Sequence, residues 1–193
     1  MSIKKQLLAG TIASLMVLGG SAMAGSYDTA PPAADKGIYI GAHGGLAMYS
    51  GDYSDSIDNG YDIGMQIGYR FNKNIRVEGA YDYMSQDVTD VDDSSINASV
   101  LMVNGYYDFD FGSKFVPYVG VGIGSLMPSA TYSDTSITNS DQNQFAYQGI
   151  VGVDYKVSEK VSVGVNYRYM SWTDTDYMNG SENIISASIN YAI

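Results

Sequence analysis

Few side chains in this sequence have the types and the spacing that catalysis or metal binding requires. His43 is the only histidine, and it can act as a general base only with a serine and a carboxylate beside it. The sequence contains no cysteine, which excludes thiolate metal ligands, a cysteine nucleophile and disulfides. The remaining candidates are charged residues, and their chemistry depends on where the fold places them.

Two short motifs are similar to ligand-binding loops but lack the context that such loops need. The stretch GVGIGS at 120–125 has the glycine spacing of a nucleotide-binding loop, yet it lies inside an alternating apolar segment with no helix after it. The stretch DVTDVDD at 87–93 lacks the glycine and the terminal glutamate of an EF-hand loop. We expect no cofactor and no ordered calcium site there.

Many of the charged residues lie in stretches that alternate between apolar and polar side chains. In YDIGMQIGYRF, at 61–71, every odd-numbered residue is apolar or aromatic and every even-numbered residue is charged, polar or glycine. A period of two over this length predicts a β-strand whose two faces meet different environments.

Eight such segments follow one another along the chain without a helical period between them. They cover about 37–49, 61–71, 75–85, 98–109, 115–125, 145–155, 161–172 and 185–193. Three connections are short, at 72–74, 110–114 and 157–160, and four are long, at 50–60, 86–97, 127–144 and 173–183. This pattern predicts an all-β fold: an eight-stranded antiparallel up-and-down transmembrane β-barrel with short periplasmic turns and long extracellular loops.

Aromatic residues decide which face of the strands meets lipid. Alternation alone also suits a soluble barrel with a polar exterior. However, aromatic residues gather at both ends of the apolar face, with Tyr69 and Tyr107 near the short turns and Tyr61 and Tyr169 near the long loops. Two aromatic girdles on one face match the two interfaces of a membrane. The apolar face therefore meets lipid, and the charged, glycine-rich face lines a narrow lumen.

Charged residues inside the lumen are expected to pair, because a buried charge without a partner is costly. The turn at 72–74 brings Arg70 opposite Arg76, and Glu78 and Asp108 lie near the same end. We expect these four residues to form a hydrogen-bonded ionic cluster that plugs the turn end. Failure of the four to lie within bonding reach of one another would remove this argument for a closed lumen. The alternative is a selectivity lining for a small pore.

A second group of luminal charges lies nearer the loops. Arg168 is expected to meet Asp82 or Asp62 if the barrel is narrow enough to bring them together. His43 faces the lumen at mid-height, so we expect a packed histidine and not a catalytic one, and the chain is not predicted to be an enzyme.

The long loops carry twelve acidic residues and no lysine or arginine, whereas lysines gather at the short turns. Solubility of exposed loops accounts for this sorting. A sharper alternative is that divalent cations bridge the loops to anionic lipopolysaccharide. Asp87, Asp90, Asp92 and Asp93 are the candidate contacts for such bridging, and the sequence does not identify a metal.

The first 36 residues are set apart from the barrel by their composition. Lys4 and Lys5, a short apolar stretch and a small-residue site ending at Ala24 predict a secretory signal peptide at 1–24. Residues 25–36 have no periodicity and are predicted to be a flexible periplasmic tail, followed by the barrel at 37–193. After cleavage, 8 basic and 21 acidic residues leave a net charge of −13. Such a chain is a poor candidate for binding nucleic acid.

Taken together, these segments resemble the small outer-membrane barrels of the OmpA, OmpX and opacity-protein type, in the porin-family or surface-antigen branch. The resemblance covers the whole mature chain. The similar segments are GIYIGAHGG, VNGYYDFDF, FVPYVGVGIG and VGVNYRYMSW. It implies location in the outer membrane of a Gram-negative bacterium, contact with outer-membrane lipid and lipopolysaccharide, assembly by the barrel insertion machinery, and a role in envelope integrity or adhesion. Barrels of this type usually end on an aromatic residue, whereas this chain ends INYAI.

These observations lead to two hypotheses about function. The first is an integral outer-membrane protein with a structural or surface-interaction role, whose extracellular loops contact an extracellular or host ligand. The alternative is a narrow porin-like channel for water, ions or very small solutes. Continuous water through the barrel would distinguish the channel from the scaffold.

Overall fold

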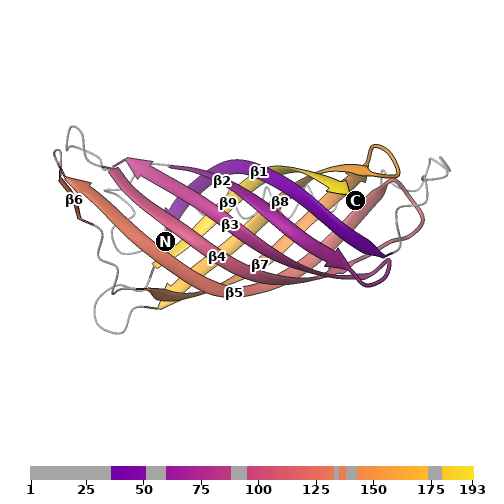
Figure 1. The fold of residues 1–193 in the computed structure, drawn as a ribbon, viewed down its shortest axis with the longest axis horizontal. Coiled ribbons are helices and arrows are strands. Elements are labelled where there is room, and N and C mark those ends of the chain that lie inside the picture. The colour runs from indigo at the N-terminus through magenta and orange to yellow at the C-terminus, as the bar shows by residue number, and fades with distance from the viewer. Residues whose placement is uncertain (1–35, 51–59, 88–94, 133–134, 138–142, 174–179) are drawn as a thin grey trace, which may run out of the picture.

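The chain folds into a closed β-barrel in the computed structural model, which describes residues 36–50, 60–87, 95–132, 135–137, 143–173 and 180–193 (Figure 1). The strands are β1 (Gly37–Ser50), β2 (Gly60–Arg70), β3 (Ile75–Asp87), β4 (Ser95–Asp108), β5 (Phe115–Tyr132), β6 (Thr135–Ile137), β7 (Gln144–Lys156), β8 (Val161–Thr173) and β9 (Gly180–Ala192). No helix among these residues is long and apolar enough to cross a membrane.

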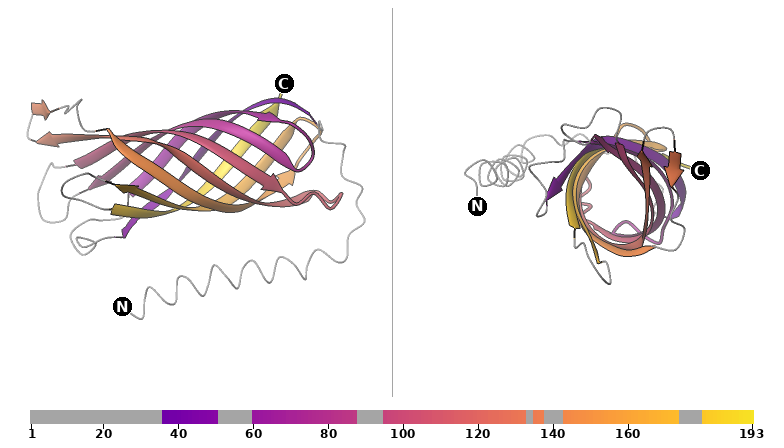
Figure 2. Two further views of the ribbon diagram at one scale, coloured as in Figure 1. Left: turned by 90° about the horizontal axis from the view of Figure 1, so that it is seen from below. Right: turned by 90° about the vertical axis from the view of Figure 1, so that its left-hand side faces the viewer.

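Eight of the nine strands form the barrel wall, as predicted. Each pairs antiparallel with its neighbour along the chain, and β1 pairs with β9 to close the ring, with Ala42 opposite Ile189. Figure 2 shows this closure in the view along the barrel. A closed ring leaves no unpaired strand edge in hydrocarbon, where an unpaired amide would be costly.

The strands extend farther at the loop end than the hydropathy pattern indicates. β5, predicted to end near 125, continues to Tyr132 and pairs with β4 as far as Ser95 and Thr131. The short strand β6 lies in the predicted 127–144 loop and pairs only with the end of β5. The residues LMPSATY at 126–132 do not alternate strictly between apolar and polar types, so backbone pairing and not hydropathy marks the strand here.

The exterior of the barrel is apolar, as the aromatic girdles predict. Met65, Leu46 and Val121 are 66%, 62% and 71% exposed, although each is a large apolar side chain. Burial alternates with exposure along β2 and β7, so the charged residues of the same strands turn inward. This arrangement is the reverse of a soluble barrel, and lipid supplies the apolar surroundings that the exterior requires.

Side-chain hydrogen bonds hold the short turns that set the register. Asn72 Oδ1 accepts from the amides of Asn74 and Ile75 at 2.8 and 2.9 Å. Asn74 in turn donates to the Asp108 carbonyl at 2.8 Å and ties this turn to β4. The register that follows places Arg70 directly opposite Arg76.

Candidate functional site: the filled lumen

Arg76 occupies the centre of the lumen near the turn end. Its Nε atom donates to Oδ1 of Asp108 at 3.1 Å, and its Nη2 atom lies 3.5 Å from Oδ2 of Asp154. The guanidinium lies over the rings of Tyr106 and Tyr118, at 4.3 and 4.6 Å from their centres. Arg76 is therefore held by two carboxylates and two aromatic faces, which fill the barrel at this level.

The predicted four-residue cluster forms only in part. Arg70 lies 4.0 Å from Asp108, which Arg76 also contacts, but no ion pair joins Glu78 to either arginine among the described residues. Glu78 instead accepts hydrogen bonds from the hydroxyls of Tyr39 and Tyr106, at 2.9 and 2.8 Å. The expectation of a mutually bonded set of four is therefore wrong for Glu78.

The glycine at position 68 explains where Glu78 finds its partner. Gly68 lies opposite Glu78 on β2, and a Cβ atom there would overlap the Tyr39 ring. Tyr39 crosses the space left by the missing side chain and reaches Glu78. Asp154 takes the place beside Arg76 that we predicted for Glu78. Because β7 does not pair with β3, reasoning from adjacent strands alone misses this contact across the lumen.

The second predicted group is brought together nearer the loops. Arg168 donates from Nη1 to Oδ1 of Asp82 at 2.8 Å and from Nη2 to Oδ1 of Asp62. His43 joins them, since its Nε2 atom lies 2.6 Å from Asp82 Oδ1 and its Nδ1 atom lies 2.9 Å from Gln66 Oε1. Arg168 thus contacts both aspartates, whereas we predicted a contact with one or the other.

The geometry around His43 bears on catalysis and on metal binding. A carboxylate adjoins the ring, and Ser188 is its register partner on β9, but no hydrogen bond joins His43 to Ser188 among the described residues. Each ring nitrogen of His43 already has an oxygen partner, Gln66 for Nδ1 and Asp82 for Nε2. Ligand atoms of His43, Asp62 and Asp82 lie within 4.8 Å of one another, a spacing that suits a cation. The Arg168 guanidinium contacts those same aspartate oxygens and supplies the positive charge.

An amide pair extends from each charged group. Gln66 Nε2 donates to Asn190 Oδ1 at 2.9 Å, and Gln148 Nε2 donates to Asn104 Oδ1 at 2.7 Å. Between the groups lies a pocket of about 30 Å³ whose lining includes His43 and Asn166. A space of this size can hold ordered water.

An apolar layer, which we did not predict, fills the lumen on the loop side of Arg168. Its buried members are Ala47, Ala80, Met84, Val100, Met102, Leu126, Ala146, Met170 and Ile184. Ala98 and Trp172 pack against it. These residues share the alternation parity of the luminal charges, so their parity was the signal that could have revealed the layer. These side chains fill much of the lumen above the charges, where the buried Glu182 is the register partner of Met170.

Several predicted features lie outside the described residues. Asp90, Asp92 and Asp93 of the candidate cation-bridging loop are among them, and Asp87 is placed only as the last residue of β3. The predicted signal peptide at 1–24 and all but the last residue of the predicted tail at 25–36 also lie outside them.

Comparisons with known proteins agree with the fold. Residues 11–192 match the family described as outer membrane protein β-barrel domain. A protein from Haemophilus influenzae of uncharacterised function is 30% identical over 114 residues, which cover 54% of this chain and 62% of the relative. Outer membrane protein PagN of Salmonella typhimurium is 26% identical over 87 residues, which cover 40% of this chain and 36% of PagN. The chain thus spans less than two thirds of each relative.

Among solved structures, Neisserial surface protein A superposes with a TM-score of 0.69 at 22% identity, over 81% of this chain and 97% of that protein. OprG of Pseudomonas aeruginosa superposes with a TM-score of 0.54 at 17% identity, over 86% and 98%. Identities this low show the fold alone. With the family match across nearly the whole sequence, they establish that the chain belongs to the outer-membrane β-barrel family and resides in the outer membrane of a Gram-negative bacterium.

Proposed function

We propose that this protein is a closed, non-enzymatic membrane scaffold whose role is carried by its extracellular loops. The observation that supports the proposal is the filled lumen. The apolar layer covers the Arg168 group on the loop side, and the Arg76 group fills the turn end. A barrel filled at both levels has no continuous path for solutes, so its function lies in what its ends contact.

The composition of the loops indicates the kind of contact. Twelve acidic residues and no basic residue in the four long connections give the outer surface a concentrated negative charge. Divalent cations would bridge such a surface to the phosphates of lipopolysaccharide, since carboxylate oxygens are the ligands that calcium and magnesium prefer. This bridging would support envelope integrity and would leave the loop tips available for adhesion to an extracellular or host ligand.

Neutralising one loop tests the surface role. In the variant Asp87→Asn, Asp90→Asn, Asp92→Asn and Asp93→Asn, we expect calcium-dependent binding of the folded protein to lipopolysaccharide vesicles to fall, and cells that carry it to become more sensitive to detergent. The control is Lys73→Gln with Lys114→Gln, which changes charge at the opposite end. Equal binding by the wild type and the loop variant, in calcium and in chelator alike, would contradict the proposal.

A narrow channel is the second candidate. The observation in its favour is the polar pocket of about 30 Å³ between the two charged groups, which is large enough to hold a water molecule. The apolar layer lies on the loop side of that pocket, and Arg76 lines it toward the turn end, so we expect no continuous water path through it. Conductance measurements distinguish this candidate from the scaffold.

A further inference from the structure

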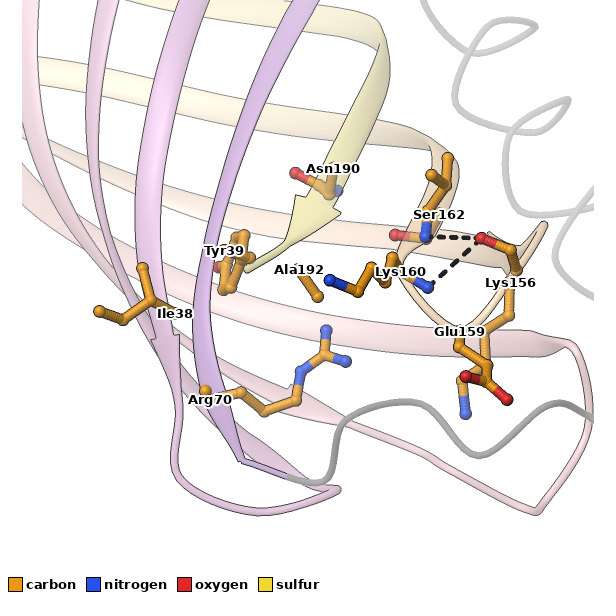
Figure 3. A pocket seen from close by; sticks show the side chains of 12 residues that line it. Ile38, Tyr39, Arg70, Lys156, Glu159, Lys160, Ser162, Asn190 and Ala192 are labelled. Atoms are coloured by element: carbon orange, nitrogen blue, oxygen red, sulfur yellow. Dashed lines mark hydrogen bonds between the residues drawn. The ribbon is translucent and has the colours of Figure 1, made fainter.

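A pocket with a basic lining opens at the turn end of the barrel, beside the filled lumen. It lies where β1 begins and β9 ends, beside the turn that joins β7 to β8, and its volume is about 40 Å³. Arg70, Lys156 and Lys160 line it, and Glu159 is the one acidic residue of the lining (Figure 3). Pockets for whole metabolites are about 300 Å³ or larger, so this one suits a small group.

The Arg70 guanidinium has hydrogen-bond donors that no acceptor satisfies among the described residues. Its nearest carboxylate oxygen, on Asp108, lies 4.0 Å away, and Arg76 contacts Asp108 more closely, at 3.1 Å. The buried Nε atom of Arg70 has no hydrogen-bond acceptor among the described residues. The terminal nitrogens of Arg70 also make no hydrogen bond among the described residues, so they retain donors for a pair of oxygens, such as those of a phosphate.

Lys160 faces the same pocket from the turn that follows β7. Its ammonium group lies 5.6 Å from the centre of the Tyr191 ring, and it makes no ion pair among the described residues. Lys156 is different, because it donates to Asp110 at 2.9 Å. Figure 3 shows the Arg70 and Lys160 side chains directed toward the middle of the pocket, while the Glu159 carboxylate lies to one side.

A hydroxyl group adds a third donor. Ser158 Oγ accepts from the amides of Lys160 and Val161 at 3.3 and 3.1 Å, so its own hydrogen remains to be donated. Ser158 also lines the pocket. A guanidinium, an ammonium and a hydroxyl thus surround one small space, and an anion satisfies such a set of donors.

The surrounding charge has the sign that an anion requires. Among the described residues, the turn side of the barrel carries seven basic side chains: Lys36, Arg70, Lys73, Arg76, Lys114, Lys156 and Lys160. It carries five acidic side chains: Glu78, Asp108, Asp110, Asp154 and Glu159. On the described loop side, Arg168 is the only basic residue. An anion is thus attracted to the turn end and repelled from the loop end.

We propose that the pocket between Arg70 and Lys160 binds a phosphate group. This group is carried either by an anionic phospholipid in the leaflet that surrounds the turn end or by a soluble phosphate compound. The proposal does not depend on the role of the loops or on whether the lumen conducts.

The test uses the three arginines of the chain as reporters. The folded protein is labelled with ¹⁵N-arginine in phosphatidylcholine micelles and titrated in separate arms with inorganic phosphate and with short-chain phosphatidylglycerol. We expect the Arg70 Nε–H signal to move saturably while the Arg168 signal stays in place. Movement in the lipid arm alone identifies a headgroup site, and movement in the phosphate arm alone identifies a site for soluble phosphate.

Two lysine variants separate a site from diffuse attraction. Lys160→Gln removes one of the proposed ligands and should weaken binding about tenfold, as expected for loss of a charge-assisted hydrogen bond. Lys114→Gln removes the same charge from the same end outside the pocket lining and should leave the affinity within about twofold of the wild type. Equal weakening by both variants, or an Arg70 signal that moves in neither arm, would overturn the proposal. Heat-modifiable migration on gels verifies that each variant is folded.

Discussion

Arg168 on β8 donates a hydrogen bond to Asp82 on β3 at 2.8 Å, although β2, β1 and β9 separate these two strands around the barrel. The contact therefore crosses the lumen and does not follow the wall. Arg168 reaches Asp62 on β2 with its other terminal nitrogen. One guanidinium thus fixes the distance between opposite sides of the barrel at this level.

Removal of Arg168 should destabilise the barrel strongly. Arg168→Ala leaves Asp62 and Asp82 buried, with only His43 in contact, and breaking a buried ion pair of this kind costs about 3–5 kcal/mol. Urea unfolding in lipid vesicles measures this loss, with fluorescence of Trp172 as the signal, since it is the only tryptophan and packs against the apolar layer. Glu159→Gln, at an exposed turn, is the control and should change stability by less than about 0.5 kcal/mol. A loss below about 1 kcal/mol for Arg168→Ala would contradict the assigned network.

Two strand glycines, one luminal and one exterior, should respond oppositely to alanine. At Gly124, inside the lumen, a Cβ atom would overlap the Leu101 carbonyl oxygen and the Met102 sulfur. At Gly149, on the exterior, a Cβ atom meets nothing within 4 Å. We expect Gly124→Ala to lower the free energy of unfolding by about 1–3 kcal/mol, as overpacking does, and Gly149→Ala to leave it unchanged or slightly raised. Equal effects in the same unfolding assay would show that position 124 does not face a packed lumen.

The turn between β4 and β5 should make a small pH-dependent contribution to stability. Partial burial raises the pKa of the Asp110 carboxyl, but hydrogen bonds from Lys156 and from the Gly112 amide, together with the nearby lysine charges, outweigh it, and the pKa lies below its usual range. A lowered pKa in the folded state stabilises the protein above the unfolded-state pKa of about 3.9, and this stabilisation is lost as the pH falls through the folded-state pKa.

Comparison of the wild type with Asp110→Asn measures that contribution. We expect the variant to be less stable by up to about 1 kcal/mol at neutral pH, and the difference to shrink below about pH 4. Lys156→Gln should move the Asp110 pKa toward its ordinary value in a ¹³C carboxyl titration. A difference in stability that persists undiminished at low pH would rule out the ionised Asp110 as its cause.

The barrel could be predicted from sequence because a membrane-spanning strand alternates between apolar and polar residues and has aromatic residues near both ends. Tyr69 and Tyr107 at the turns and Tyr169 near the loops fixed which face meets lipid. The pattern fails in the upper part of β5 and in β6, because the residues LMPSATY and TSI do not alternate strictly between apolar and polar types.

The content of the lumen was harder to predict than its wall. Arg168 with Asp62 and Asp82 followed from shared parity and height. The Arg76 contact with Asp154 did not, because it depends on which strands face each other across the closed ring. The apolar layer was missed for a related reason. Met102 and Ile184 lie on the face assigned to polar residues, and only closure of the barrel brings them together.

Closure of the lumen is the central claim, and single-channel conductance in a planar bilayer tests it most directly. The sample is the refolded protein, with its insertion verified by heat-modifiable migration. The companion variant combines Met102→Ala with Met170→Ala, which shortens two side chains of the apolar layer and retains the Arg168 group. The control protein is Gly149→Ala, which alters only the exterior.

We expect the wild type and Gly149→Ala to be silent, and any openings to appear only when the side chains of the apolar layer are shortened. Steady, reproducible openings of the wild-type protein would contradict closure of the lumen, because a conducting barrel requires a continuous water path past Arg168 and Arg76.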